Sequence, residues 1–158
     1  MPASTNRALL AQFYDSFARG DAVGMNACYS PDIAFSDPVF GPLRGDRARA
    51  MWTMLCGGLV DFKLTYEIGD VDDAGGHVDW IATYTYSATK RRVRNEVRGT
   101  YAFADGLIAK HDDVFDLWKW AAQALGPSGA LLGWTPFVRA KIAKMASSRL
   151  DAYVASRA

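Results

Sequence analysis

The hydrophobic pattern of the chain changes its period twice, from helical to alternating and back. Near the N-terminus, Leu9, Leu10, Phe13 and Phe17 recur at helical spacing, with Ser4 or Thr5 as the cap and Gly20 as the end. A short second helix is expected between Asp21 and Pro31. It is followed by a strand over Ile33–Asp37, a loop over Asp37–Gly45 marked by prolines and glycines, and a helix over Asp46–Cys56.

Alternating patterns then predict four strands: Leu59–Val71, Gly76–Ala88, a strand around 96–103, and Leu107–Phe115. In the third of them Val97, Gly99, Tyr101 and Phe103 share one face, which we expect to be buried. Helical spacing returns over Leu117–Leu125 and again from Thr135-Pro136. The last helix places an apolar stripe on one side (Val138, Ile142, Met145, Ala146, Leu150, Tyr153) and basic residues on the other (Arg139, Lys141, Lys144, Arg149).

Segregation of strands from helices predicts an α+β fold: a curved antiparallel sheet with helices packed on its concave face, around a cone-shaped pocket. A chain of 158 residues is one domain by size. The last helix is expected to pack on the domain or across a dimer, the alternative being a membrane-surface helix. Ile81, Thr83 and Thr85, on the outer face of the sheet, form a candidate homodimer surface.

The composition of the chain indicates which classes of binding partner and cofactor to expect. The net charge of +1 disfavours nucleic acid and acidic membranes, and we interpret the basic run Lys90–Arg94 as a solvated hairpin tip. Cys28 and Cys56 are expected to be reduced thiols. Without an apolar signal segment or membrane span, we predict a cytoplasmic protein. The two histidines and two cysteines lack metal-ligand spacing, and we expect neither a metal nor another cofactor.

The candidate acid/base groups are His111 and Asp113, two residues apart on the last strand and therefore on one face. The preceding turn decides which face. A three-residue loop, Ala104-Asp105-Gly106, turns His111 and Asp113 inward, with Phe115 on the same face. A two-residue loop, Asp105-Gly106, shifts the register by one and turns them outward. We favour the three-residue loop, because the other register buries three charged residues.

The order of elements, together with Phe13-Tyr-Asp-Ser-Phe-Ala-Arg-Gly-Asp21, Phe35-Ser-Asp-Pro-Val39 and the segment Gly106–Gly126, resembles the nuclear transport factor 2-like superfamily. Within it, the chain is most similar to the SnoaL-like and ketosteroid-isomerase-like branch. The resemblance covers about Ala8–Gly126. It implies a SnoaL-like domain over residues 1–126, followed by a C-terminal helical extension over residues 127–158.

The resemblance also implies roles for individual residues. The isomerase base is the aspartate of an Asp-Pro pair, which matches Asp37-Pro38. The two oxyanion donors of that enzyme, a tyrosine and a protonated aspartate that also serve as a general example of carboxyl pKa tuning, fall on Phe13 and Gly99. Steroid isomerisation of the usual kind is therefore not expected. The acid/base aspartate of SnoaL-like cyclases matches Asp113.

We therefore predict a cofactor-free enzyme that performs isomerisation, cyclisation or hydration on an apolar substrate bearing a carbonyl or epoxide. Asp113, His111 and Asp37 are the candidate catalytic residues. The predicted pocket wall comprises Phe13, Tyr14, Phe17, Trp52, Trp80, Tyr84, Gly99, Tyr101, Phe103 and Phe115. The alternative is a non-catalytic ligand-binding or dimerisation module of the same fold. Family members commonly pair sheet to sheet, so a homodimer is expected.

Overall fold

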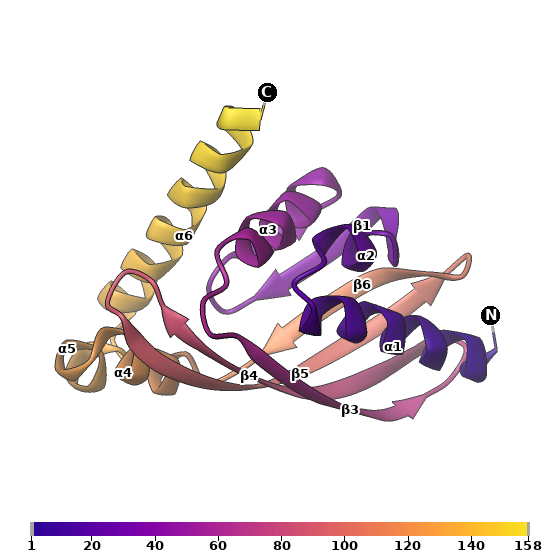
Figure 1. The fold of residues 1–158 in the computed structure, drawn as a ribbon, viewed down its shortest axis with the longest axis horizontal. Coiled ribbons are helices and arrows are strands. Elements are labelled where there is room, and N and C mark those ends of the chain that lie inside the picture. The colour runs from indigo at the N-terminus through magenta and orange to yellow at the C-terminus, as the bar shows by residue number, and fades with distance from the viewer. Residues whose placement is uncertain (1, 158) are drawn as a thin grey trace.

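The computed structural model describes residues 2–157 (Figure 1). Its elements, in order, are α1 (Ala3–Ala18), α2 (Ala22–Asn26), β1 (Tyr29–Asp37), β2 (Gly41–Arg44), α3 (Asp46–Gly57), β3 (Lys63–Val71), β4 (Gly75–Tyr86), β5 (Arg91–Ala104), β6 (Leu107–Val114), α4 (Leu117–Leu125), α5 (Pro127–Leu132) and α6 (Pro136–Arg157). Within the described residues, no helix combines the length and hydropathy of a membrane span.

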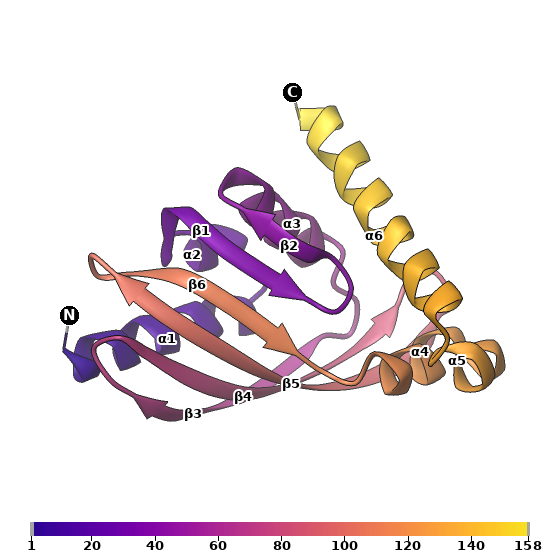
Figure 2. The same cartoon turned by 180° about the vertical axis from the view of Figure 1, so that it is seen from behind.

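The six strands form one curved, open sheet in the order β2-β1-β6-β5-β4-β3. Neighbouring strands are antiparallel except β1 and β6, which run parallel. Figures 1 and 2 show α1, α2 and α3 on the concave side of the sheet. The α+β fold predicted from the sequence is confirmed, and the parallel β1–β6 pair makes the sheet a mixed one.

The main core lies between these helices and the concave face. Leu10, Phe13 and Phe17 of α1 and Trp52 of α3 pack there, and Val97, predicted to face inward, is also buried. A smaller cluster at the wide end of the sheet joins Val93 to α4 and to Ile142 of α6. Burial of these apolar side chains is the main force that holds the helices on the sheet.

Local predictions fail at three places. The first helix begins at Ala3, after Pro2 and without a side-chain cap, so the predicted caps Ser4 and Thr5 lie inside it. The segment predicted as a loop contains β2, which pairs with β1; its Pro42 is tolerated because β2 is an edge strand. The helix α5 was also not predicted.

The hairpin between β5 and β6 has the turn of one predicted register and the inward-facing residues of the other. Ala104 pairs with Leu107, so the loop is the two-residue turn Asp105-Gly106 and the predicted three-residue loop is wrong. Both turn residues have positive φ, +53° and +76°, as expected for the tight turns that suit twisted hairpins. The pairing then shifts: Phe103 lies opposite Ile108 but Ala102 lies opposite Lys110, which leaves Ala109 as a surplus residue.

This one-residue bulge reverses the effect of the short turn. Without it, Ile108 would share its face with Lys110 and Asp112. With it, Ile108 is buried, and beyond Ala109 the buried positions become His111 and Asp113, which are 0% and 5% exposed. Both side chains therefore face inward as expected, for a reason other than the one predicted.

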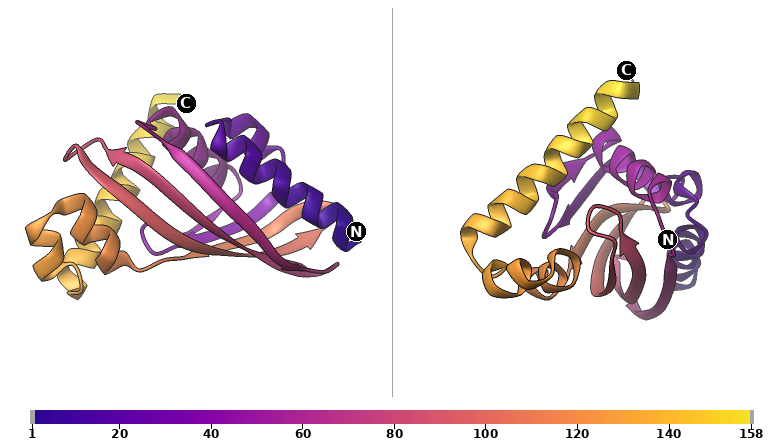
Figure 3. Two further views of the ribbon diagram at one scale, coloured as in Figure 1. Left: turned by 60° about the horizontal axis from the view of Figure 1, so that its bottom comes forward. Right: turned by 60° about the vertical axis from the view of Figure 1, so that its left-hand side comes forward.

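The helix α6 packs on the same domain. Figure 3 shows it running from α4 and α5 past α3. Ile142 and Leu150 are its buried residues, each in a different core cluster, and Asp151 forms a 2.7 Å ion pair with Arg47 of α3. Two separate anchors thus hold α6 across the wide end of the molecule.

Gly106→Ala should destabilise the protein by about 1 kcal/mol, because alanine is strained at positive φ. Gly57→Ala is the matched control: Gly57 lies in α3, and a Cβ there would meet nothing within 4 Å. The control should leave stability unchanged or raise it slightly. Urea unfolding compares the two variants; equal effects would contradict the turn described for Asp105-Gly106.

Candidate active site

His111 and Asp113 lie on β6, a central strand of the sheet, between β1 and β5. Phe35 and Tyr101 flank His111 from these two neighbours, and Gly99 lies opposite Asp113. The Nε2 atom of His111 is 2.8 Å from Oδ1 of Asp113. The parallel β1–β6 pair and the bulge thus bring an imidazole and a carboxylate together inside the protein.

A chain of hydrogen bonds fixes the imidazole. Trp52 Nε1 donates to Tyr29 Oη at 2.8 Å, and Tyr29 Oη lies 2.6 Å from His111 Nδ1. An indole N–H can only donate. Each donor is therefore used once if Tyr29 donates to Nδ1 and the neutral imidazole carries its proton on Nε2, from which it donates to Asp113. Trp80 Nε1 also donates to Asp113 Oδ1, at 3.4 Å.

Aromatic rings enclose His111 on all sides. Those of Phe13, Phe35, Trp52 and Tyr101 have their centroids 4.4–6.1 Å from its own. Tyr101 Oη lies 3.0 Å from Nε2 and shares a short hydrogen bond with Tyr14 Oη. Burial raises the pKa of Tyr14, Tyr29 and Tyr101 well above the usual value. These phenols therefore stay neutral hydrogen-bonding groups.

Asp37 ends β1, and both hydrogen bonds it accepts go to Oδ1: from the backbone N–H of Val39 at 2.9 Å and of Phe40 at 2.6 Å. Burial raises the pKa of Asp37 to about 6, although these two bonds oppose the shift; the negative charge of Asp113 contributes in the same direction as burial. This carboxyl group is therefore half-protonated near pH 6.

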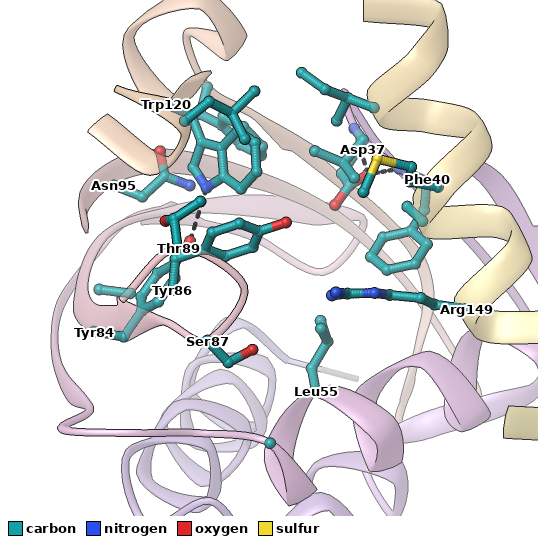
Figure 4. Close-up of a pocket in the computed structure, with 18 of the residues that line it drawn as sticks. Asp37, Phe40, Leu55, Tyr84, Tyr86, Ser87, Thr89, Asn95, Trp120 and Arg149 are labelled. Atoms are coloured by element: carbon teal, nitrogen blue, oxygen red, sulfur yellow. Dashed lines mark hydrogen bonds between the residues drawn. The ribbon is translucent and has the colours of Figure 1, made fainter. Parts of the chain in front are cut away.

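A cavity of about 860 Å³ opens between the concave face of the sheet and the helices α3, α4 and α6 (Figure 4). Asp37 and Asp113 both lie on its wall. The predicted wall residues that line it are Phe17, Trp52, Trp80, Tyr84 and Phe115. Trp120 of α4 adds to the wall and donates a 2.8 Å hydrogen bond to Tyr84 Oη. The wall is mostly apolar.

The other candidates lie beneath this wall or away from it: His111, Phe13, Tyr14, Gly99, Tyr101 and Phe103 are not lining residues. His111 reaches the cavity only through Asp113. Gly99 has a packing role, because a Cβ there would lie 2.8 Å from Tyr101 Oη and 2.9 Å from Asp113 Oδ1. Gly99, predicted as part of the pocket wall, instead leaves room for these two side chains.

Sequence reasoning missed the part of the wall that α6 supplies. Val138, Ile142, Met145 and Ala146, on the predicted apolar stripe, line the cavity, and so do Lys141 and Arg149. These two residues were expected on the opposite side of the helix. Residues 142, 145, 146 and 149 are spaced along one face of a helix, so this spacing is a signal that Arg149 lies beside the apolar stripe. The prediction grouped Arg149 with the other basic residues because of its charge.

Within residues 2–157, no three histidine, cysteine or acidic side chains gather as a metal site would require. Cys28 and Cys56 are free, and burial raises the pKa of each thiol to about 11. Asp37 and Asp113 are the carboxyl groups on the cavity wall.

The model of the SnoaL-like domain family matches residues 10–111. The chain thus belongs to the SnoaL-like domain family, within the nuclear transport factor 2-like superfamily that its sequence resembles. No curated protein matches the sequence.

Solved structures share the fold at low identity. A protein from Silicibacter sp. tm1040, proposed to be a polyketide cyclase, is 21% identical with a TM-score of 0.68, over 78% of this chain and 97% of that one. An LEH-like epoxide hydrolase of M. tuberculosis is 21% identical with a TM-score of 0.65, over 83% and 97%. A ketosteroid-isomerase-like protein of Catenulispora acidiphila, in complex with trimethylamine, is 12% identical with a TM-score of 0.65, over 81% and 97%.

Tyr29→Phe should destabilise the protein by about 2–4 kcal/mol, because it leaves the buried Trp52 N–H and His111 Nδ1 without their shared partner. Tyr153→Phe on α6 is the control and should change stability by less than about 0.5 kcal/mol. Urea unfolding measures both. A loss in Tyr29→Phe no larger than that of the control would show that the Tyr29 hydroxyl does not carry the network.

Proposed function

We propose that the protein is a cofactor-free enzyme that performs acid/base chemistry on an apolar substrate bearing a carbonyl or an epoxide. The observation that carries this proposal is the presence of two carboxyl groups in different environments on the wall of one apolar cavity. Asp113 is backed by an imidazole, whereas burial raises the pKa of Asp37 to about 6. Two carboxyl groups held in such different environments can divide into a base and an acid.

Asp113 is assigned as the general base. Its Oδ1 accepts hydrogen bonds from His111 and Trp80, and its side chain reaches the cavity wall. Asp113 removes a proton from the carbon beside a carbonyl, and the electron pair of that C–H bond moves toward the carbonyl oxygen. With an epoxide, it removes the proton from a water molecule whose oxygen attacks the ring carbon.

Asp37 is assigned as the general acid. Its proton passes to the carbonyl oxygen as the enol forms, or to the epoxide oxygen as the C–O bond breaks. The raised pKa of Asp37 supports this role, because an acid with a pKa near the working pH is both protonated often enough and able to release its proton. In an isomerisation, Asp113 then returns its proton to another carbon, and the enol O–H proton returns to Asp37 as the carbonyl re-forms.

His111 is assigned as a positioning residue, not as an electrophile that contacts the substrate. It is 0% exposed and lies behind Asp113, so its effect is to orient the carboxylate and to stabilise its negative charge. In Ser-His-Asp triads a buried carboxylate orients the imidazole that transfers the proton. Here the buried group is the imidazole, and it orients the carboxylate.

The Asp113→Asn variant should fold normally and lose about 10²–10⁴-fold in rate, because asparagine can still accept the hydrogen bond from His111 but cannot take a proton. The assay follows exchange of α-protons for deuterium in cyclic and aromatic ketones, and hydrolysis of apolar epoxides, by NMR. Asp112→Asn is the matched control: Asp112 is the neighbouring residue, bonded at 2.7 Å to Ser36 Oγ and outside the cavity lining.

Unchanged turnover in Asp113→Asn would contradict the assignment of the base. Wild-type protein that binds these ketones and epoxides without exchange or hydrolysis would favour the non-catalytic binding module instead.

The wild-type kcat/KM should be highest below pH 6 and fall about tenfold per pH unit above it, as Asp37 loses its proton. In Asp37→Asn this alkaline decline should disappear and the rate should be lower throughout. The pH profiles of the two proteins in the same exchange assay test the role. A decline near pH 6 that persists in Asp37→Asn would assign the titrating acid to another group.

A further inference from the structure

We propose that Arg149 binds the anionic group of the substrate, so that the natural ligand is an apolar acid, such as a hydrophobic carboxylate, and not a neutral molecule. This inference deepens the proposed function by naming a substrate class. It rests on the same cavity, but on a helix that the family model does not match: the match ends at residue 111, and α6 begins at Pro136.

The backbone around Arg149 is held firmly. Leu150, the next residue, is fully buried in the main core, and Asp151 is paired with Arg47 of α3 at 2.7 Å. One and two turns earlier, Met145 and Ile142 line the same cavity. The position of Arg149 at the cavity wall is therefore a consequence of how α6 is anchored.

Arg149 is the cation that Figure 4 shows pointing from α6 into the cavity, in the neighbourhood of Leu55 and Phe40. Among residues 2–157 it takes part in none of the ion pairs. Arg149 is thus an exposed, planar donor set without an acidic partner, at the wall of a mostly apolar cavity. A carboxylate is the ligand group that such a guanidinium binds best, through two parallel hydrogen bonds.

The charges of the wall also orient such a ligand. The negative charge of Asp113 repels an anion, and Asp37 does so as well once it has lost its proton. In the described chain, no ion pair joins either of them to Arg149. An anionic ligand therefore gains most with its charged end at Arg149 and its apolar body along Phe17, Trp52 and Trp80, toward the two carboxyl groups. Lys141, two turns earlier on α6, adds a second positive charge on the same wall.

Binding of 1-pyrenebutyrate and of its methyl ester, followed by pyrene fluorescence, tests the proposal without any need for turnover. The two probes share one apolar body and differ in one negative charge. The wild type should bind the carboxylate roughly tenfold more tightly than the ester. Arg149→Gln should remove most of this preference, with Lys141 accounting for any remainder, and leave the affinity for the ester unchanged.

Arg139→Gln is the matched control, because Arg139 is an arginine of α6 that is exposed like Arg149 but does not line the cavity, and this variant should keep the preference. Asp113→Asn should also keep it, which separates failure of the catalytic assignment from failure of this one. Three results would overturn the proposal: no preference for the carboxylate in the wild type, binding of neither probe, or an equal loss for both probes in Arg149→Gln.

Discussion

The structure depends on one constraint: a histidine and an aspartate are buried together beneath an aromatic core, and every polar atom of the pair needs a partner there. An unpaired polar group in such a place costs several kcal/mol. The surrounding residues supply partners for both ring nitrogens of His111 and for Oδ1 of Asp113. Tyr29 bonds Nδ1 of His111 and is itself held by a hydrogen bond from Trp52. Trp80 donates to Asp113, and Gly99, which has no side chain, leaves space for Asp113 and Tyr101. Residues of β1, α3 and β5 thus take part in the packing and hydrogen bonding of two side chains on β6.

The sequence predicts those parts of the fold that follow from local patterns. The predicted bounds of the helix Leu117–Leu125 are confirmed; in the structure Asp116 caps its start and Gly126 follows its last residue. The inward face of β5 follows from simple alternation, with Val97 and Tyr101 buried. The family resemblance pointed to Asp37 and Asp113, and both of them line the cavity.

Features that depend on contacts distant in sequence could not be predicted. The bulge at Ala109 has no signal of its own, since alanine fits a regular strand equally well. The partner of His111 at Nδ1 is Tyr29, 82 residues earlier, and no spacing rule connects them. The orientation of α6 depends on which of its faces meets α3 and α4. Its charge pattern places Arg149 on the side opposite the apolar stripe, whereas in the structure Arg149 lines the cavity together with residues of that stripe.

The bulge at Ala109 has a consequence for how this family of chains can vary. It divides the β5–β6 hairpin into two independent registers, one set by the turn at Asp105-Gly106 and one set by the Tyr101–His111 and Gly99–Asp113 pairs. Loss of Ala109 would merge them into a regular ladder without changing which residues lie opposite His111 and Asp113. The tip of the hairpin can therefore change in length over evolution while the buried pair keeps its pairing with β5. The surplus residue Ala109 absorbs the difference in register.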